Sequence, residues 1–109
     1  MDAPSLLPYR TELRAYISDL IGFIEDKISE AEADPGSRAA ALSEAAGAFP
    51  MIRDRLLRED QTIHAQFMLI GFFDLDLERL ASLPPDEFAA ATHDLRRCLS
   101  GTRSVLQET

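Results

Sequence analysis

Cysteine is almost absent from this chain: Cys98 is the only one among 109 residues. A single cysteine cannot form an intrachain disulfide, and a zinc site built from several thiolates is excluded as well. We therefore expect a protein of the reducing cytoplasm. We also expect no metal site and no cofactor, because no second His-acid pair stands at helical spacing to complete a ligand set. Lysine is equally scarce: the chain has one lysine, Lys27, and ten arginines. Such a preference for arginine is typical of GC-rich bacterial coding.

Long apolar runs are also missing. The most apolar stretch, residues 67–73, has seven residues and includes Gly71, whereas a membrane span needs about twenty. The first residues, Met1-Asp2-Ala3-Pro4, lack the basic start and apolar centre of a secretory signal. We expect neither a membrane-spanning segment nor a leader.

Basic charge is outweighed by acidic charge. The chain has 11 basic and 19 acidic residues, which gives a net charge of -8. A surface of that sign repels phosphate backbones and anionic lipids. We expect the chain to bind neither nucleic acid nor membranes, and to act on another protein or a small molecule.

Helical periodicity is the dominant pattern. From about residue 8 to residue 33, apolar residues recur at three- and four-residue steps, which predicts a long amphipathic helix. Its stripe consists of Leu13, Ile17, Leu20, Ile24, Ile28 and Ala31. A turn at 34–37 follows, with Ser37 as the expected cap of a short alanine-rich helix.

The second half of the chain is predicted to be helical too. A third helix should begin near Met51, after an extended Phe49, and continue to Leu83 with an interruption or kink at Gly71. The prolines at 84–85 should start a last helix. The sequence thus predicts an all-α bundle of four to five helices in a single domain spanning residues 1–109.

Apolar surface exceeds what a bundle this small obviously needs. Phe23 lies beside the stripe of the first helix, and residues 67–73 are apolar on every side. Such surface is either core or covered by another molecule. We predict a homodimer at micromolar concentration, with partner contacts through Phe23, Phe67, Phe72, Arg96 and Arg97. Residues 67–73 would alternatively line a site for a small apolar ligand.

One segment carries residue types at the spacing of a known chemistry: Ala91-Thr92-His93-Asp94-Leu95-Arg96-Arg97-Cys98-Leu99. The helical repeat places His93 on the side opposite Leu95, so the imidazole is predicted to face water. An exposed ring nitrogen can accept a phosphoryl group, with the neighbouring carboxylate of Asp94 as the base.

Residues 88–106 resemble the phosphoacceptor (dimerisation) helix of bacterial histidine kinases. In that family an acidic, an aliphatic and a basic residue follow the acceptor histidine, and Asp94, Leu95 and Arg96 match them in turn. The resemblance implies that His93 accepts the phosphoryl group and that Arg96 offsets its charge. Cys98 stands where the family usually has proline, and the Gly-rich ATP-binding motifs are missing, so we expect no autokinase activity.

These features predict a small, non-enzymatic, cytoplasmic regulatory or protein-interaction protein. The resemblance suggests bacterial two-component signalling, with a signalling kinase or a response regulator as partner. Two alternatives stay open: a histidine phosphotransfer protein that uses His93, and a small apolar-ligand binder. The plainest interpretation of His93 is an exposed histidine on an ordinary helix.

His64 is the only other histidine. It follows Asp60 by four residues, so a shared helix face would let the two side chains form a hydrogen bond. Arg58 and His64 also have the separation found in some helical endoribonucleases, although Glu59 replaces the small polar residue expected there. We expect an ordinary surface histidine.

Overall fold

The computed structural model describes the backbone of residues 3–108 and the side chains of residues 11–107. Within that range the chain forms helices and turns and contains no strand, which confirms the all-α fold. The elements are α1 (Ala3–Ala33), η1 (Pro35–Ser37), α2 (Arg38–Ala46), α3 (Ala48–Glu59), α4 (Gln61–Leu69), η2 (Phe72–Asp74), α5 (Leu77–Leu80) and α6 (Pro85–Glu108).

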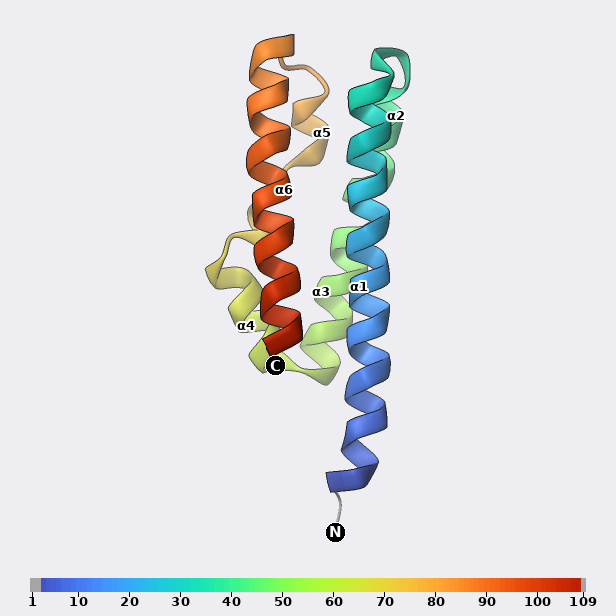
Figure 1. The fold of residues 1–109 in the computed structure, drawn as a ribbon, viewed down its shortest axis with the longest axis vertical. Helices are drawn as coiled ribbons and strands as arrows, with labels where there is room; N and C mark the ends of the chain where they lie inside the picture. Colours follow the sequence, from blue (N-terminus) through green and yellow to red (C-terminus); the bar gives the residue numbers. More distant parts are fainter. Residues whose placement is uncertain (1–2, 109) are drawn as a thin grey trace.

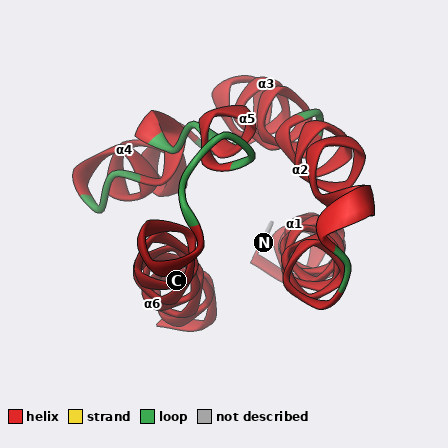
Figure 2. Cartoon of the chain, turned by 90° about the horizontal axis from the view of Figure 1, so that it is seen from above, coloured by secondary structure: helices red, strands yellow, loops and turns green. Residues whose placement is uncertain are grey.

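The helices form an elongated antiparallel bundle, 56 Å in its longest dimension. In Figure 1, α1 rises, α2 and α3 return end to end, α4 and α5 lead back up, and α6 descends beside α1. Seen from above in Figure 2, these segments follow an arc that begins with α1 and ends with α6. The bundle therefore has four antiparallel segments: α1, α2 with α3, α4 with α5, and α6.

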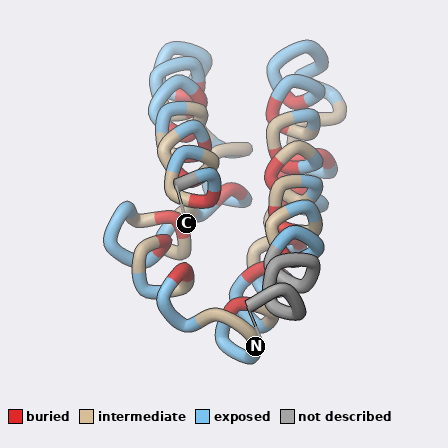
Figure 3. The backbone as a smooth tube through the Cα atoms, turned by 60° about the horizontal axis from the view of Figure 1, so that its bottom comes forward, coloured by how far each residue is buried: buried red, intermediate tan, exposed pale blue. Residues whose placement is uncertain are grey.

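The core follows the apolar stripes of the two long helices. Figure 3 shows buried positions along the inner sides of both. On α6 the helical repeat predicts that Phe88, Ala91, Leu95, Leu99 and Thr102 or Leu106 face the core. All of these are buried except Ala91, which is partly covered. On α1 one position differs from the prediction: Ile21 is fully buried, whereas Leu20 is only partly covered. In the described part of the chain, no helix has the length and apolarity needed to cross a membrane.

An aromatic cluster closes the core between α3, α4 and η2. The Phe72 ring lies 4.8 Å from Phe49, 5.2 Å from Phe67 and 5.1 Å from Phe73, centroid to centroid. These separations and the tilted or edge-on angles are the favourable arrangement for aromatic pairs. The cluster fixes the irregular segment after α4 to the rest of the bundle.

The predicted continuous third helix is wrong, because the chain breaks at Asp60. This residue ends α3 and caps α4, with φ -156° and ψ 86°. Its carboxylate accepts a hydrogen bond from the backbone N–H of Ile63 at 3.2 Å. The cap satisfies one of the free donors at the start of α4 and offsets the cost of the break. The second interruption, at Gly71, is confirmed, and its φ of +80° suits a glycine.

Two smaller predictions at helix starts are also wrong. Phe49 is helical rather than extended, because Pro50 lies in the first turn of α3, where its missing N–H costs little. Ser37 makes no side-chain cap to α2. Its hydroxyl instead donates to the carboxylate of Asp34 at 2.8 Å, and the N–H of Gly36 donates to the same group at 2.9 Å.

Candidate functional site

The two residues at the centre of the kinase-like segment, His93 and Asp94, lie exposed on α6. This helix continues unbroken from Pro85 to Glu108, through Gly101. Leu95 and Leu99 point into the core on the opposite side. The structure therefore places the imidazole of His93 in water on a continuous helix, as a phosphoacceptor would require.

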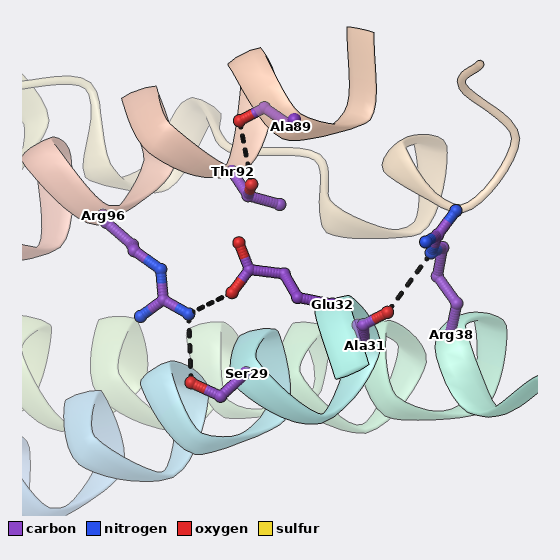
Figure 4. A network of polar contacts seen from close by, with 7 residues as sticks. All are labelled: Ser29, Ala31, Glu32, Arg38, Ala89, Thr92 and Arg96. Atoms are coloured by element: carbon purple, nitrogen blue, oxygen red, sulfur yellow. Dashed lines mark hydrogen bonds and ion pairs between the residues drawn. The ribbon is translucent and has the colours of Figure 1, made fainter. Parts of the chain in front are cut away.

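Arg96 does not share that surface, contrary to the prediction. Figure 4 shows its guanidinium reaching across to α1, where it donates to the carboxylate of Glu32 and to the hydroxyl of Ser29. Partial burial raises the pKa of Glu32, but the Arg96 guanidinium and the nearby Thr92 hydroxyl outweigh it and leave the pKa below its ordinary value. Arg96 is thus a structural link between α1 and α6.

Arg97 is the exposed arginine of this segment. It follows His93 by four residues, which places the two side chains one helical turn apart on the same face. Arg97 therefore shares the face of His93, whereas the guanidinium of Arg96 is bonded to Glu32 and Ser29. The charge-offsetting role of Arg96 stays a prediction.

The three phenylalanines predicted to contact a partner lie in different surroundings. Phe67 and Phe72 are fully buried in the aromatic cluster, so neither offers surface to another molecule in this fold. Phe23 keeps 39% of its surface exposed. It lines a cleft of about 420 Å³ between α1 and α3, together with Leu20, Glu44, Gly47, Ala48 and Met51.

Most of the large apolar side chains that are exposed lie instead on α3 and α4 and just after α4. A cleft of about 300 Å³, named here the α3–α4 cleft, is lined by Arg53, Leu57, His64, Met68, Phe73 and Asp74. Met68 exposes 57% of its surface, and Leu57 is also exposed. Neighbouring exposed apolar side chains are a feature of interaction surfaces, so this cleft is a candidate site.

Exposure continues past the cleft along the chain. Leu69 exposes 87% of its surface and Ile70 is exposed as well, just before the turn at Gly71. We name the α3–α4 cleft together with Leu69 and Ile70 the α3–α4 surface. It holds four of the six exposed large apolar residues in the described side chains.

His64 belongs to this surface and not to a pair with Asp60. Its ring stacks on Phe73, with 5.0 Å between centroids and 25° between planes. Asp60 is occupied as the cap of α4, and the two residues are joined through the backbone, where the N–H of His64 donates to the Asp60 carbonyl at 3.2 Å. The stacked pair forms a rigid wall of the α3–α4 cleft.

Charges of both signs border the α3–α4 surface. Arg53 and Asp74 line the cleft, and Arg53 forms an ion pair with Asp54 at 3.3 Å. Arg58 lines an adjoining hollow with Asp54 and Leu57. The border is therefore locally balanced in a chain whose net charge is strongly negative.

The described residues do not form a metal-binding site, and Cys98 lacks the surroundings of a reactive thiol. The described side chains contain no group of three or more His, Cys, Asp or Glu placed to hold a metal ion. Burial raises the pKa of Cys98, and the nearby Thr102 hydroxyl only partly opposes this shift. The thiol is also 3.6 Å from the carbonyl oxygen of Ile70, toward which it donates.

Comparisons of the chain with protein-family models, with curated proteins and with solved structures return no match. The exposure of His93 and of part of Phe23 agrees with the sequence prediction, and residues 67–73 divide into buried Phe67 and Phe72 and exposed Met68, Leu69 and Ile70. The exposure of Leu57 was not predicted. The helical repeat offered a signal, because Leu56, Ile63 and Phe67 share one buried face and the residues that follow Phe67 turn away from it.

Proposed function

We propose that the protein is a small helical interaction protein that pairs with a second copy of itself through the α3–α4 surface. The observation that carries the proposal is the exposure of Met68, Leu69 and Ile70 in succession beside the α3–α4 cleft. Fully burying one such side chain contributes about 1.5–3 kcal/mol. Several of them at one interface favour association strongly.

The charges around the surface favour a second copy as the occupant. Two identical acidic chains repel each other in general, but the border of this surface carries Arg53 and Arg58 as well as Asp54 and Asp74. In a two-fold symmetric contact the same patch of each copy meets the other, so positive residues of one border can pair with negative residues of the other. A border that carried charge of one sign only would repel the border of the second copy.

The chain offers a matched pair of variants for the test. Met68 in the α3–α4 surface and Met51 in the α1–α3 cleft expose similar fractions, 57% and 50%. We expect sedimentation equilibrium to show a dimer at micromolar concentration for the wild-type protein and for Met51→Glu. Met68→Glu should be monomeric, because the new carboxylate would be buried at the interface.

Three results would overturn this proposal. A wild-type protein that stays monomeric at millimolar concentration removes the dimer. A dimer that survives Met68→Glu but is lost in Met51→Glu moves the interface to the α1–α3 cleft. A monomer whose α3–α4 cleft binds small apolar molecules would support the ligand-binder alternative, for which the cleft volume is at the lower end of known sites.

We further propose that this interaction is regulatory and belongs to bacterial, cytoplasmic two-component signalling, which rests on the resemblance of residues 88–106 to a kinase helix. The exposure of His93 and Asp94 on a continuous helix supports a second candidate function, histidine phosphotransfer. Incubation with a phosphorylated response regulator tests it. Acid-labile label that is lost in His93→Gln supports phosphotransfer, and no label on the wild type refutes it.

A further inference from the structure

A separate cleft lies between the two long helices, away from the α3–α4 surface. It is about 360 Å³ in volume, and we name it the α1–α6 cleft. Figure 1 shows the lower half of α6 running beside the middle of α1. The lining comes from Arg14, Ala15 and Ser18 on α1 and from Arg103, Leu106 and Gln107 on α6.

One of its two arginines is already neutralised. The guanidinium of Arg103 donates twice to the carboxylate of Glu25, at 2.7 and 3.2 Å, and once to the hydroxyl of Ser18 at 2.9 Å. This side chain therefore forms a fixed wall of the cleft. The Ser18 hydroxyl accepts from Arg103, so its own proton stays available to a ligand.

Arg14 is in a different state. It is partly buried, and its Nε is fully covered yet has no hydrogen-bond acceptor among the described side chains. Four other arginines of the described chain, at positions 38, 53, 96 and 103, donate to a carboxylate or a carbonyl oxygen. Arg55 also has a covered Nε without a hydrogen bond, but it forms an ion pair with Glu59. A guanidinium that is partly desolvated and has no counter-charge is unfavourable, and an anion in the cleft would offset this cost through its charge.

We propose that the α1–α6 cleft binds a small carboxylic acid, with its carboxylate on Arg14 and its apolar body against Ala15 and Leu106. A guanidinium matches the two oxygens of a carboxylate. The Arg103–Glu25 pair is neutral overall. Among the described residues that line the cleft, Arg14 is therefore the one unpaired charge, and its single positive charge suits a singly charged anion. A phosphate dianion would add a second negative charge close to Glu25.

The test compares three probes of the wild-type protein by NMR chemical-shift titration. Octanoate carries the proposed carboxylate and apolar body, octanol lacks the charge, and inorganic phosphate lacks the apolar body. We expect octanoate to bind with a millimolar or lower Kd and to shift residues of the α1–α6 cleft. Octanol and phosphate should bind at least about tenfold more weakly, because each loses one of the two interactions.

Arg14→Gln should weaken octanoate binding at least about tenfold, as expected for the loss of a charge-assisted hydrogen bond. The matched control is Arg97→Gln, which removes an exposed arginine of α6 outside the cleft and should leave the affinity unchanged. Should Arg14→Gln not fold, Ala15→Leu adds bulk to the α1 wall of the cleft and should also abolish binding.

The proposal is overturned by an absence of octanoate binding, by octanol binding as tightly as octanoate, or by equal losses in Arg14→Gln and Arg97→Gln. The last result would indicate a general attraction to positive charge. None of these outcomes depends on dimerisation, because the α1–α6 cleft and the α3–α4 surface share no residue.

Discussion

Arg96 of α6 donates a hydrogen bond to the carboxylate of Glu32 on α1, although 64 residues separate the two along the chain. The same guanidinium holds the hydroxyl of Ser29 at 3.0 Å. Together with the bonds from Arg103 to Glu25 and Ser18, this contact ties the last helix to the first along their length. Polar bridges thus complement the buried stripes in joining α1 and α6.

The Arg96–Glu32 link should add modestly to stability. Both side chains are more than one-third exposed, so Arg96→Gln should lower the free energy of unfolding at pH 7 by no more than about 1 kcal/mol. Chemical denaturation of the two proteins measures the difference. A loss several times larger would show that Arg96 supports more than this surface link.

This link should also depend on pH in a defined direction. The pKa of Glu32 is lower in the folded chain than its ordinary value of 4.5, so the stabilisation is complete above that pH and is lost as the pH falls through the lower folded-state value. The gap between wild type and Arg96→Gln should therefore narrow below pH 4.5. A gap that widens in acid would contradict this account.

The long stripes were predictable from the sequence because each depends on local spacing alone. Leu95, Leu99 and Leu106 recur at the helical repeat and are buried as expected. The break at Asp60 could not be predicted in the same way, since the residues on both sides of it favour a helix. The Asp60 carboxylate caps α4 only when the chain has already turned so that the Ile63 N–H can donate to it. Arg96 was assigned to the wrong face because its partner on α1 is distant in sequence.

Two glycines should respond oppositely to substitution by alanine. Gly71 has φ of +80°, a conformation that costs an alanine about 1–2 kcal/mol. Gly101 lies inside α6, and a Cβ there would meet nothing within 4 Å. Gly101→Ala should therefore stabilise the protein by about 0.5–1 kcal/mol. Thermal and chemical denaturation check both signs, and a stabilising Gly71→Ala would show that the turn adopts another conformation.

Phe72 should be essential for stability, whereas Leu69 should not. Phe72 is fully buried among three other phenylalanines, so Phe72→Ala should lower the free energy of unfolding by about 3–5 kcal/mol. Leu69 is almost entirely exposed, and Leu69→Ala should change it by less than about 0.5 kcal/mol in the monomer. Denaturation at high dilution compares them, and a small effect of Phe72→Ala would contradict the described core.

Cys98 should react slowly with alkylating reagents at neutral pH. Burial raises the pKa of its thiol, which lowers the fraction of reactive thiolate, and the thiol lies against the Ile70 carbonyl. The rate with iodoacetamide should rise markedly when the protein is unfolded. A native rate equal to that of a free cysteine would indicate that the segment after α4 opens readily.

The most direct measurement of the proposed pairing is isotope-filtered NMR on a mixture of labelled and unlabelled copies, which reports only contacts between two chains. The account predicts nuclear Overhauser effects between copies at the side chains of Leu57, Met68 and Leu69, and none at Met51 or Phe23. Contacts confined to Met51 and Phe23, or no contacts between copies at millimolar concentration, would contradict the assignment of the α3–α4 surface as the interface.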